Sequence, residues 1–212
     1  DAINQYLAIV DAGKISAPLY YNIANSYYRL GYLSNSILYY ERALKVDPSY
    51  IDAQENLKIA HSSVLDNIES VPDFILITWI TNIKNSLTSN SWAVITLILL
   101  FVLLGLLLMF RLMPTIKARK TSFVLACVVF VLSVSTFSFA LSVKKDALSE
   151  DSAIVMLPVS SSKSSPDANS KSLFILHEGT KISILDELGS WIKIELSDGR
   201  QGWMPLNDVE II

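Results

Sequence analysis

The sequence has one cysteine and two histidines, and each shortage excludes a class of function. Cys127 cannot form a disulfide within the chain, and a single thiol cannot build a thiolate metal site. His61 and His177 lie in no pattern that supplies a partner. No Ser/Cys–His arrangement, metal-ligand cluster or glycine-rich phosphate loop is recognisable in the sequence. We therefore expect a protein that is not an enzyme and that uses no cofactor or metal.

Charge is also scarce and unevenly distributed. Charged residues make up 17% of the 212 residues and hydrophobic residues 51%, whereas soluble chains carry roughly 25% charged residues. The formal net charge of −3 gives no support for nucleic-acid binding. Residues 1–72 carry a net charge of −3, residues 73–143 of +4 and residues 144–212 of −4. The sequence thus predicts two acidic arms around a hydrophobic, basic middle.

The middle contains two long segments without any charged residue, at 92–110 and at 121–143. As helices they would be about 28 and about 34 Å long, enough to cross the hydrocarbon core of a bilayer. The alternative is a pair of buried core helices. Soluble helices are rarely apolar all round over such lengths, so we expect two transmembrane helices.

A basic loop, residues 111–120, is expected between the two spans and makes them a hairpin. It contains Arg111, Lys117, Arg119 and Lys120. The positive-inside rule places such a loop in the cytoplasm and both arms on the other side of the membrane. A linker follows at 144–152. Within the second span we expect one face of hydroxyl residues to pack on the first span, and the alternative partner of this face is another membrane protein. The face comprises Ser135, Ser138 and Ser142.

Residues 73–88 are apolar but too short to cross a bilayer. Isoleucines recur there at a spacing of three residues, and Lys84 follows them. We expect an interfacial helix, with Trp79 and Trp92 at the level of the lipid headgroups. The alternative, a cap packed on the N-terminal domain, stays open.

The N-terminal region, residues 1–70, resembles tetratricopeptide repeats. Residues 17–50 fill the 34-residue pattern of that family, with Gly31 at the turn between two helices. The same register predicts a partial repeat at 1–16 and a capping helix at 51–68. The signature positions hold Tyr20, Ile23, Ala24, Tyr27, Ser36, Tyr40, Ala43 and Pro48.

The tetratricopeptide resemblance also implies a binding surface. Members of the family bind peptides or proteins along the concave face of the first helices. In this sequence the resemblance places Tyr21, Asn25, Tyr28 and Arg29 on that face. The alternative role of these side chains is packing against the neighbouring repeat.

The C-terminal region, residues 153–212, is predicted to be a small all-β barrel. Ile192, Ile194 and Leu196 alternate with polar residues, as in a half-buried strand, and Asp198-Gly199 is a strong hairpin signal. We expect five short strands, with a polar loop at 160–170.

This region resembles bacterial SH3-like domains. The residues that carry the resemblance are Gly189, Trp191, Asp198, Gly199, Arg200, Gly202 and Trp203. Some relatives bind peptidoglycan or wall peptides, and others only pack on neighbouring domains. The resemblance makes Trp191 and Trp203 candidate ligand-binding residues, whereas the alternative places them in the barrel core or at its rim. A peptide would lie along the edge of the second expected strand and the 160–170 loop.

Taken together, the repeat, the interfacial helix, the hairpin and the barrel resemble the BatE-type family of the Bacteroides aerotolerance (Bat) operon. This resemblance implies the inner membrane of a Gram-negative bacterium, periplasmic arms, and partners such as von Willebrand A-type Bat proteins and a MoxR-type ATPase. Because the chain begins within a repeat and with Asp, we expect an upstream segment with an export signal to be missing.

Two functions remain open. The first is a membrane-anchored, non-enzymatic protein-interaction scaffold of the envelope, in contact with membrane lipid and partner proteins. The second is an envelope sensor or anchor whose SH3-like domain binds peptidoglycan.

Overall fold

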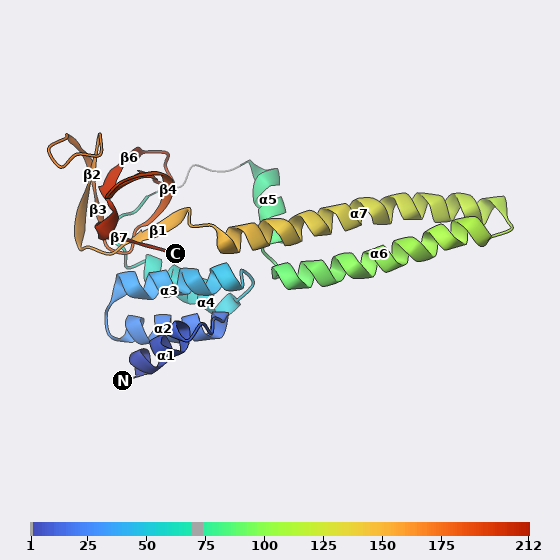
Figure 1. Cartoon of the computed structure of the whole chain (residues 1–212), viewed down its shortest axis with the longest axis horizontal. Helices are drawn as coiled ribbons and strands as arrows, with labels where there is room; N and C mark the ends of the chain where they lie inside the picture. Colours follow the sequence, from blue (N-terminus) through green and yellow to red (C-terminus); the bar gives the residue numbers. More distant parts are fainter. Residues whose placement is uncertain (1, 69–73) are drawn as a thin grey trace. The chain divides into compact units, whose positions relative to one another are not determined.

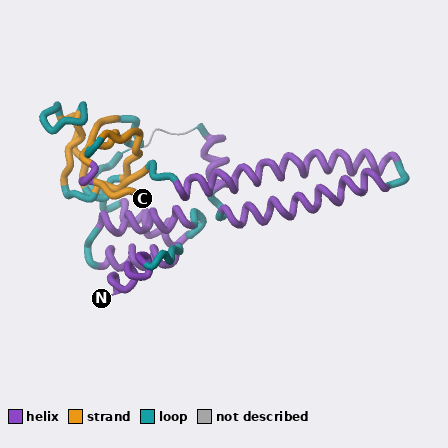
Figure 2. Tube along the Cα trace, viewed as in Figure 1, coloured by secondary structure: helices purple, strands orange, loops and turns teal. Residues whose placement is uncertain are grey.

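The computed structural model describes residues 2–68 and 74–212. The chain divides into two units, one made of residues 1–78 with 149–212 and the other of residues 79–148. The first unit contains a helical repeat and an antiparallel β-sheet domain, and the second contains two long apolar helices (Figures 1 and 2). The predicted fold class is confirmed: tetratricopeptide-like helices, two apolar helices and an all-β SH3-like domain.

The helical repeat consists of α1 (Ala2–Asp11), α2 (Ala17–Arg29), α3 (Leu33–Val46) and α4 (Ile51–His61). The α2 helix starts where the Ser16 side chain accepts a hydrogen bond from the Leu19 N–H at 3.4 Å, a typical N-terminal cap. The turn to α3 passes through Gly31 at a φ of 82°, which glycine adopts without strain. The α4 helix ends at His61, so it is shorter than the capping helix expected over 51–68.

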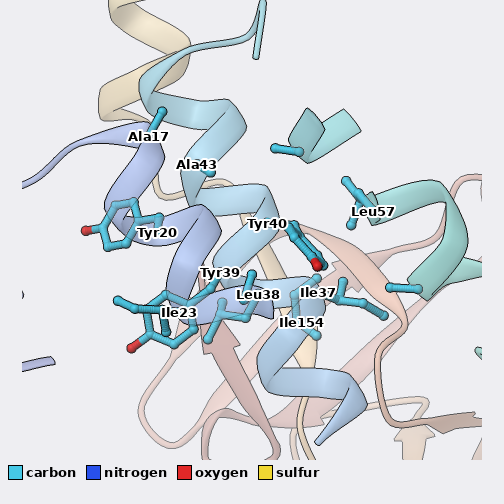
Figure 3. Packing of buried hydrophobic residues seen from close by; sticks show 13 residues of the cluster. Ala17, Tyr20, Ile23, Ile37, Leu38, Tyr39, Tyr40, Ala43, Leu57 and Ile154 are labelled. Atoms are coloured by element: carbon cyan, nitrogen blue, oxygen red, sulfur yellow. The ribbon is translucent and has the colours of Figure 1, made fainter. Parts of the chain in front are cut away.

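Small and large side chains alternate in the core of the repeat, as the family pattern requires. Ala24, Ser36 and Ala43 are completely buried, and Tyr40 is 1% exposed. The small residues let the helices approach closely, and the tyrosine fills the space beside them. Figure 3 shows that Ile154, from the β-sheet domain, belongs to the same cluster as Ile37.

The second unit is dominated by a hairpin of α6 (Ser89–Leu112) and α7 (Ile116–Leu148), which are long and apolar enough to cross a membrane. Most of their apolar side chains are exposed, unlike those of core helices in soluble proteins. The basic loop expected over 111–120 is wrong in extent, because only residues 113–115 lie between the helices. Pro114 lies between the two helices. The four cations of the expected loop lie within the helices themselves: Arg111 in α6, and Lys117, Arg119 and Lys120 in α7.

The two long helices pack through small residues on α7. Ala126, Ser133 and Ala140 recur every seven residues and are buried, and the Thr96 hydroxyl of α6 donates to the Thr136 Oγ1 of α7 at 2.9 Å. The predicted contact through Ser135, Ser138 and Ser142 is wrong. Ser135 and Ser138 are exposed, on the opposite side of α7. Small residues every seven positions keep the same side of α7 against α6 along the whole helix. The serine face covers only two turns and cannot do this.

The shorter apolar helix α5 (Ile75–Lys84) replaces the helix expected over 73–88, of which residue 73 lies outside the described residues. Its apolar side chains are exposed, and Trp79 is 65% exposed. Trp92 is instead 8% exposed. Its ring packs on Phe139 with 5.2 Å between centroids, and its Nε1 donates to the Lys84 carbonyl at 2.9 Å.

The β-sheet domain has seven strands in the described residues rather than the five expected. The strands pair antiparallel in the order β3-β2-β6-β5-β4-β1-β7. Residues 160–163 of the expected polar loop lie in β2, and residues near the C-terminus form β7. The strands are β1 (Ser152–Val155), β2 (Val159–Lys163), β3 (Ser172–His177), β4 (Lys181–Leu188), β5 (Trp191–Glu195), β6 (Gln201–Pro205) and β7 (Val209–Ile211).

Two positions of the C-terminal motif, 199 and 202, require glycine for different physical reasons. Gly199 has a φ of 85° in the β5–β6 turn, a conformation that disfavours side chains. At Gly202 a Cβ atom would lie 2.0 Å from the Ser162 Oγ and 3.2 Å from the Lys163 carbonyl oxygen. Strand β2 therefore crosses β6 too closely for any side chain at position 202.

Candidate functional site

The four groove residues predicted from the sequence lie together around one pocket of about 270 Å³ in the repeat. The pocket is formed by α2, α3 and α4. Ile59 occupies the position one 34-residue repeat after Asn25, so the repeat register extends into α4. The pocket is lined by Tyr21, Asn25, Tyr28, Arg29, Tyr40, Asn56 and Ile59.

The floor of this pocket is a network of neutral hydrogen bonds. The Tyr40 hydroxyl donates to the Asn25 Oδ1 at 2.5 Å, and the Asn56 Nδ2 donates to the same oxygen at 3.0 Å and to the Tyr21 hydroxyl at 3.2 Å. Burial raises the pKa of the Tyr40 phenol above its ordinary value, so the hydroxyl stays neutral and keeps its proton to donate. The network fixes the orientation of the Asn25 amide.

The predicted residues therefore have two different roles. Tyr21 packs edge-on against Tyr50, with 5.3 Å between ring centroids, so it also holds the fold, as the packing alternative proposed. Tyr28 is 40% exposed and Arg29 is exposed. In the described chain, neither side chain has a hydrogen bond or ion pair, and the Asn25 amide N–H groups have no acceptor. The pocket thus offers amide donors, a guanidinium and an aromatic ring to a ligand.

Tyr40 and Asn56 are pocket residues that the sequence reasoning missed. Tyr40 belongs to the family signature, and its hydroxyl also reaches the pocket. Asn56 lies on α4, where the repeat pattern is incomplete. Nothing in the sequence marked Asn56 as a binding residue, because a single polar residue next to Leu57 is ordinary on a solvent-exposed helix.

The barrel tryptophans lie outside the barrel core. Ile192, Ile194 and Met204 are completely buried, whereas the half-buried Trp191 and Trp203 lie on the other side of β5 and β6. Trp203 pairs with Lys193, and Trp191 pairs with Pro205, so the tryptophans are diagonal neighbours on one outer face. This placement agrees with a rim position and leaves both residues accessible.

The expected peptide-binding edge belongs to β3, the strand at one end of the sheet order. Leu173 and Ile175 on this strand are 47% and 57% exposed. The adjoining 160–170 segment is only partly a loop, because residues 159–163 form β2 and pair with both β3 and β6. A ligand strand could therefore add to β3 but not to β2.

A second polar cluster joins the repeat to the barrel through Asp66. Its carboxylate accepts hydrogen bonds from the His177 backbone N–H and the Thr180 hydroxyl, both at 2.7 Å, and its other oxygen lies 2.7 Å from the His177 Nδ1. Burial acts to raise the pKa of Asp66, but these hydrogen bonds outweigh burial and hold the pKa below its ordinary value. His177 thus has a partner that its sequence neighbourhood did not indicate.

Glu41 on α3 forms a second group of ion pairs at the contact between the repeat and the barrel. The Lys181 Nζ lies 2.8 Å from the Glu41 Oε2, and the His61 Nε2 lies 3.8 Å from the Glu41 Oε1. Burial acts to raise the pKa of Glu41, yet His61 and Lys181 hold it below its ordinary value. The barrel also approaches closely at Gly179, where a Cβ would lie 2.9 Å from the Ile37 Cδ1.

Charged groups of α3 also hold the C-terminal end of the chain. Arg42 donates to the Glu210 carboxylate at 3.0 Å and to the Ile211 carbonyl at 2.7 Å. Lys45 donates to the Ile212 carbonyl at 2.6 Å and to the Ser149 carbonyl. The barrel-facing side of α3, defined as Ser34, Ile37, Glu41, Arg42 and Lys45, is therefore covered.

Comparison with protein families supports both modules. Residues 17–50 match the family model described as "Tetratricopeptide repeat", and residues 163–210 match the one described as "Bacterial SH3 domain". A search of curated proteins finds no match to this sequence. Within the described residues, no group of three or more His, Cys, Asp or Glu side chains could hold a metal ion. The two matched modules suggest roles in protein interaction or wall binding.

Proposed function

We propose that this protein is a membrane-anchored, non-enzymatic scaffold of the bacterial envelope, and that its groove binds an extended peptide segment of a partner protein. The observation that carries the proposal is the groove pocket, in which Asn25, Tyr28 and Arg29 keep donors and aromatic surface free of partners in the described chain. Aromatic and arginine side chains are the residues that most often dominate protein interfaces. The neutral floor fits a peptide backbone, and Arg29 fits a carboxylate.

The membrane anchor in this proposal is the α6–α7 hairpin. Arg111, Lys117, Arg119 and Lys120 gather at its turn, which favours a cytoplasmic turn in the inner membrane and periplasmic arms. The resemblance to BatE-type proteins adds a specific hypothesis: the scaffold works in a Bat-type aerotolerance complex and binds von Willebrand A-type membrane proteins.

The groove is tested by co-purification from native membranes with the full chain. The double variant Tyr28→Ala/Arg29→Ala should lose the partner, because both side chains are exposed and hold nothing in the fold. The matched control, Lys14→Ala/Tyr32→Ala, removes a cation and a tyrosine outside the pocket and should retain the partner. Equal recovery by both double variants would refute the groove assignment.

The topology is tested with reporter fusions after residues 115 and 150. Residue 115 lies between α6 and α7, and residue 150 lies after α7. We expect cytoplasmic reporter activity at 115 and periplasmic activity at 150. A periplasmic signal at 115 would reverse the topology.

The second candidate function, peptidoglycan binding by the barrel, is favoured by the accessible tryptophan pair on β5 and β6. Aromatic faces suit sugar rings and peptides, since they combine a large apolar area with few rotatable bonds. The test is sedimentation of the full chain with purified sacculi. Trp191→Ala/Trp203→Ala should abolish sedimentation if the barrel is a wall-binding module, whereas Tyr28→Ala/Arg29→Ala should not affect it.

A further inference from the structure

The turn end of the hairpin contains a pocket that no part of the proposed scaffold function uses. Its volume is about 340 Å³, and Phe110, Ile116 and Phe123 supply its apolar walls. Arg119 and Lys120 complete the lining. Both are exposed. The pocket thus combines a hydrophobic surface with two cations.

The Arg119 guanidinium lies over an aromatic ring. Its guanidinium carbon lies 5.4 Å from the centroid of the Phe110 ring, within the range of a cation–π contact. The Phe110 ring in turn lies 5.7 Å from that of Phe123. A guanidinium stacked on a ring in this way still has its N–H donors free, and these can bind two oxygens of one anion.

The positive charge at this end of the hairpin is not neutralised by the protein. The sequence has no Asp or Glu between residues 74 and 145. Among the described residues, Arg111, Lys117, Arg119 and Lys120 make no ion pair. At the opposite end of the hairpin, by contrast, the Lys84 Nζ lies 2.5 Å from the Asp146 Oδ2. The turn end therefore carries positive charge that no described side chain compensates.

We propose that this pocket binds one anionic glycerophospholipid. Its phosphate lies against Arg119 and Lys120, and an acyl chain covers Ile116 and Phe123. The inference rests on the membrane anchoring proposed above, which brings the end of the apolar helices to the headgroup level. A lipid satisfies both features of the pocket, since a free phosphate ion would leave the aromatic walls exposed to water. Basic pockets between membrane helices bind anionic headgroups by this combination.

The experiment is a lipid titration of the detergent-purified full chain, followed by native mass spectrometry. We expect one phosphatidylglycerol to be retained, in preference to phosphatidylcholine. Arg119→Gln/Lys120→Gln should weaken retention about 25-fold, from about fivefold for each cation. The matched control Lys144→Gln/Lys145→Gln removes the same charge from the other end of α7 and should change retention by less than about twofold.

A third variant distinguishes a specific lipid site from non-specific electrostatic attraction of anionic lipid. Arg119→Lys keeps the charge but loses the planar fork over Phe110, so it should weaken retention severalfold. Unchanged retention in Arg119→Lys, an equal loss in the Lys144/Lys145 control, or equal retention of phosphatidylcholine would overturn the proposal. Displacement of the lipid by millimolar inorganic phosphate would also overturn it, in favour of a free-anion site.

Carbonate extraction of membranes distinguishes this proposal from the anchoring on which it rests. A chain that resists extraction but shows no lipid preference refutes the lipid site alone. A chain released by carbonate refutes the anchor, and with it the lipid site.

Discussion

The two sides of helix α3 meet very different surroundings. One side carries Ser36, Tyr40 and Ala43 into the core of the repeat, and the Tyr40 hydroxyl reaches the floor of the groove. The other side carries Ile37 and Glu41 against the barrel. Because α3 is covered on both sides, the open polar surface of the repeat lies at the groove formed with α2 and α4.

The chemistry of the two sides also differs. The groove is built from neutral amides and phenols, and several of its donors have no acceptor in the described chain. The barrel contact is built from carboxylates and cations that satisfy one another, as Asp66 and Glu41 do. Buried charged groups are costly to leave unpaired, so the barrel contact suits a permanent interface, whereas the groove suits an exchangeable ligand.

The largest effect is expected from removing the side chain that serves both the core and the groove. Tyr40→Ala should destabilise the repeat by about 3–5 kcal/mol, as other buried aromatic truncations do. Tyr40→Phe keeps the ring and loses only the bond to Asn25, so it should cost about 1 kcal/mol. Urea unfolding followed by near-ultraviolet circular dichroism measures both. Similar costs would show that the hydroxyl, rather than the ring, supports the repeat.

The next largest loss of stability is expected from a substitution that breaks the contact between the repeat and the barrel. Asp66→Asn removes the charge that accepts the three bonds from His177 and Thr180, and it should cost roughly 1.5–3 kcal/mol, the range for hydrogen bonds to charged groups. Asp11→Asn is the matched control on an exposed residue and should stay within about 0.5 kcal/mol. Thermal unfolding of the full chain in detergent is the measurement. A neutral Asp66→Asn variant would mean that the barrel does not depend on this carboxylate.

A third variant tests the barrel itself. Gly202→Ala should destabilise it by about 1–3 kcal/mol, as overpacking does, because the added Cβ meets the Ser162 Oγ at 2.0 Å. Ser162→Gly in the same chain removes both the Oγ and the Cβ and should recover part of the loss. Thermal unfolding of the full chain in detergent is again the measurement. Lack of any rescue would place the clash on the β2 backbone instead.

Acidification should loosen the barrel contact. Asp66 and Glu41 both have a folded-state pKa below the ordinary value, so their stabilisation is complete above about pH 4, the unfolded pKa of carboxyls. It is lost as the pH falls further through the folded pKa values. The melting temperature should therefore drop as the pH falls below about 4, and it should drop less in Asp66→Asn. An equal drop in both proteins would assign the acid sensitivity to other carboxylates.

The smallest effect on folding is expected in the groove. Tyr28→Ala/Arg29→Ala should change the free energy of unfolding by no more than about 0.5 kcal/mol, as surface substitutions do, while it abolishes partner capture. Unfolding and co-purification are measured on the same preparation. A large loss of stability would show that these side chains support the repeat and would weaken the contrast between the two sides of α3.

Much of this architecture could be predicted from the sequence because it depends on local periodicity. Ala24, Tyr40 and Ala43 are buried as the repeat pattern requires, and Gly199 occupies the turn that Asp198-Gly199 indicates. Strand β2 was missed because its residues are mostly serines, which favour loops in sequence reasoning. Ser160 and Ser162 are buried by tertiary contacts that leave no local signal; Gly202 of β6, for example, lies against Ser162.

The candidate site shows the same limit. The groove residues on α2 were implied by the tetratricopeptide resemblance, whose pattern lies within one local segment. The Asp66–His177 pair instead joins residues 111 positions apart, with no local signal at either end. The hydroxyl face of α7 was misjudged for a related reason. A short stripe of serines is visible in the sequence, but the competing seven-residue repeat determines which side of α7 meets α6.

The unit made of repeat and barrel is interrupted in the chain by the whole hairpin, and this has a consequence for biosynthesis. A ribosome adds about 5–20 residues per second, so His177 emerges on the order of 5–20 s after Asp66, given their separation of 111 residues. During that interval the nascent repeat exposes Ile37 and Glu41 without their cover. Completion of the domain therefore has to wait until the apolar hairpin has been synthesised, and the barrel-facing side of α3 stays uncovered until then.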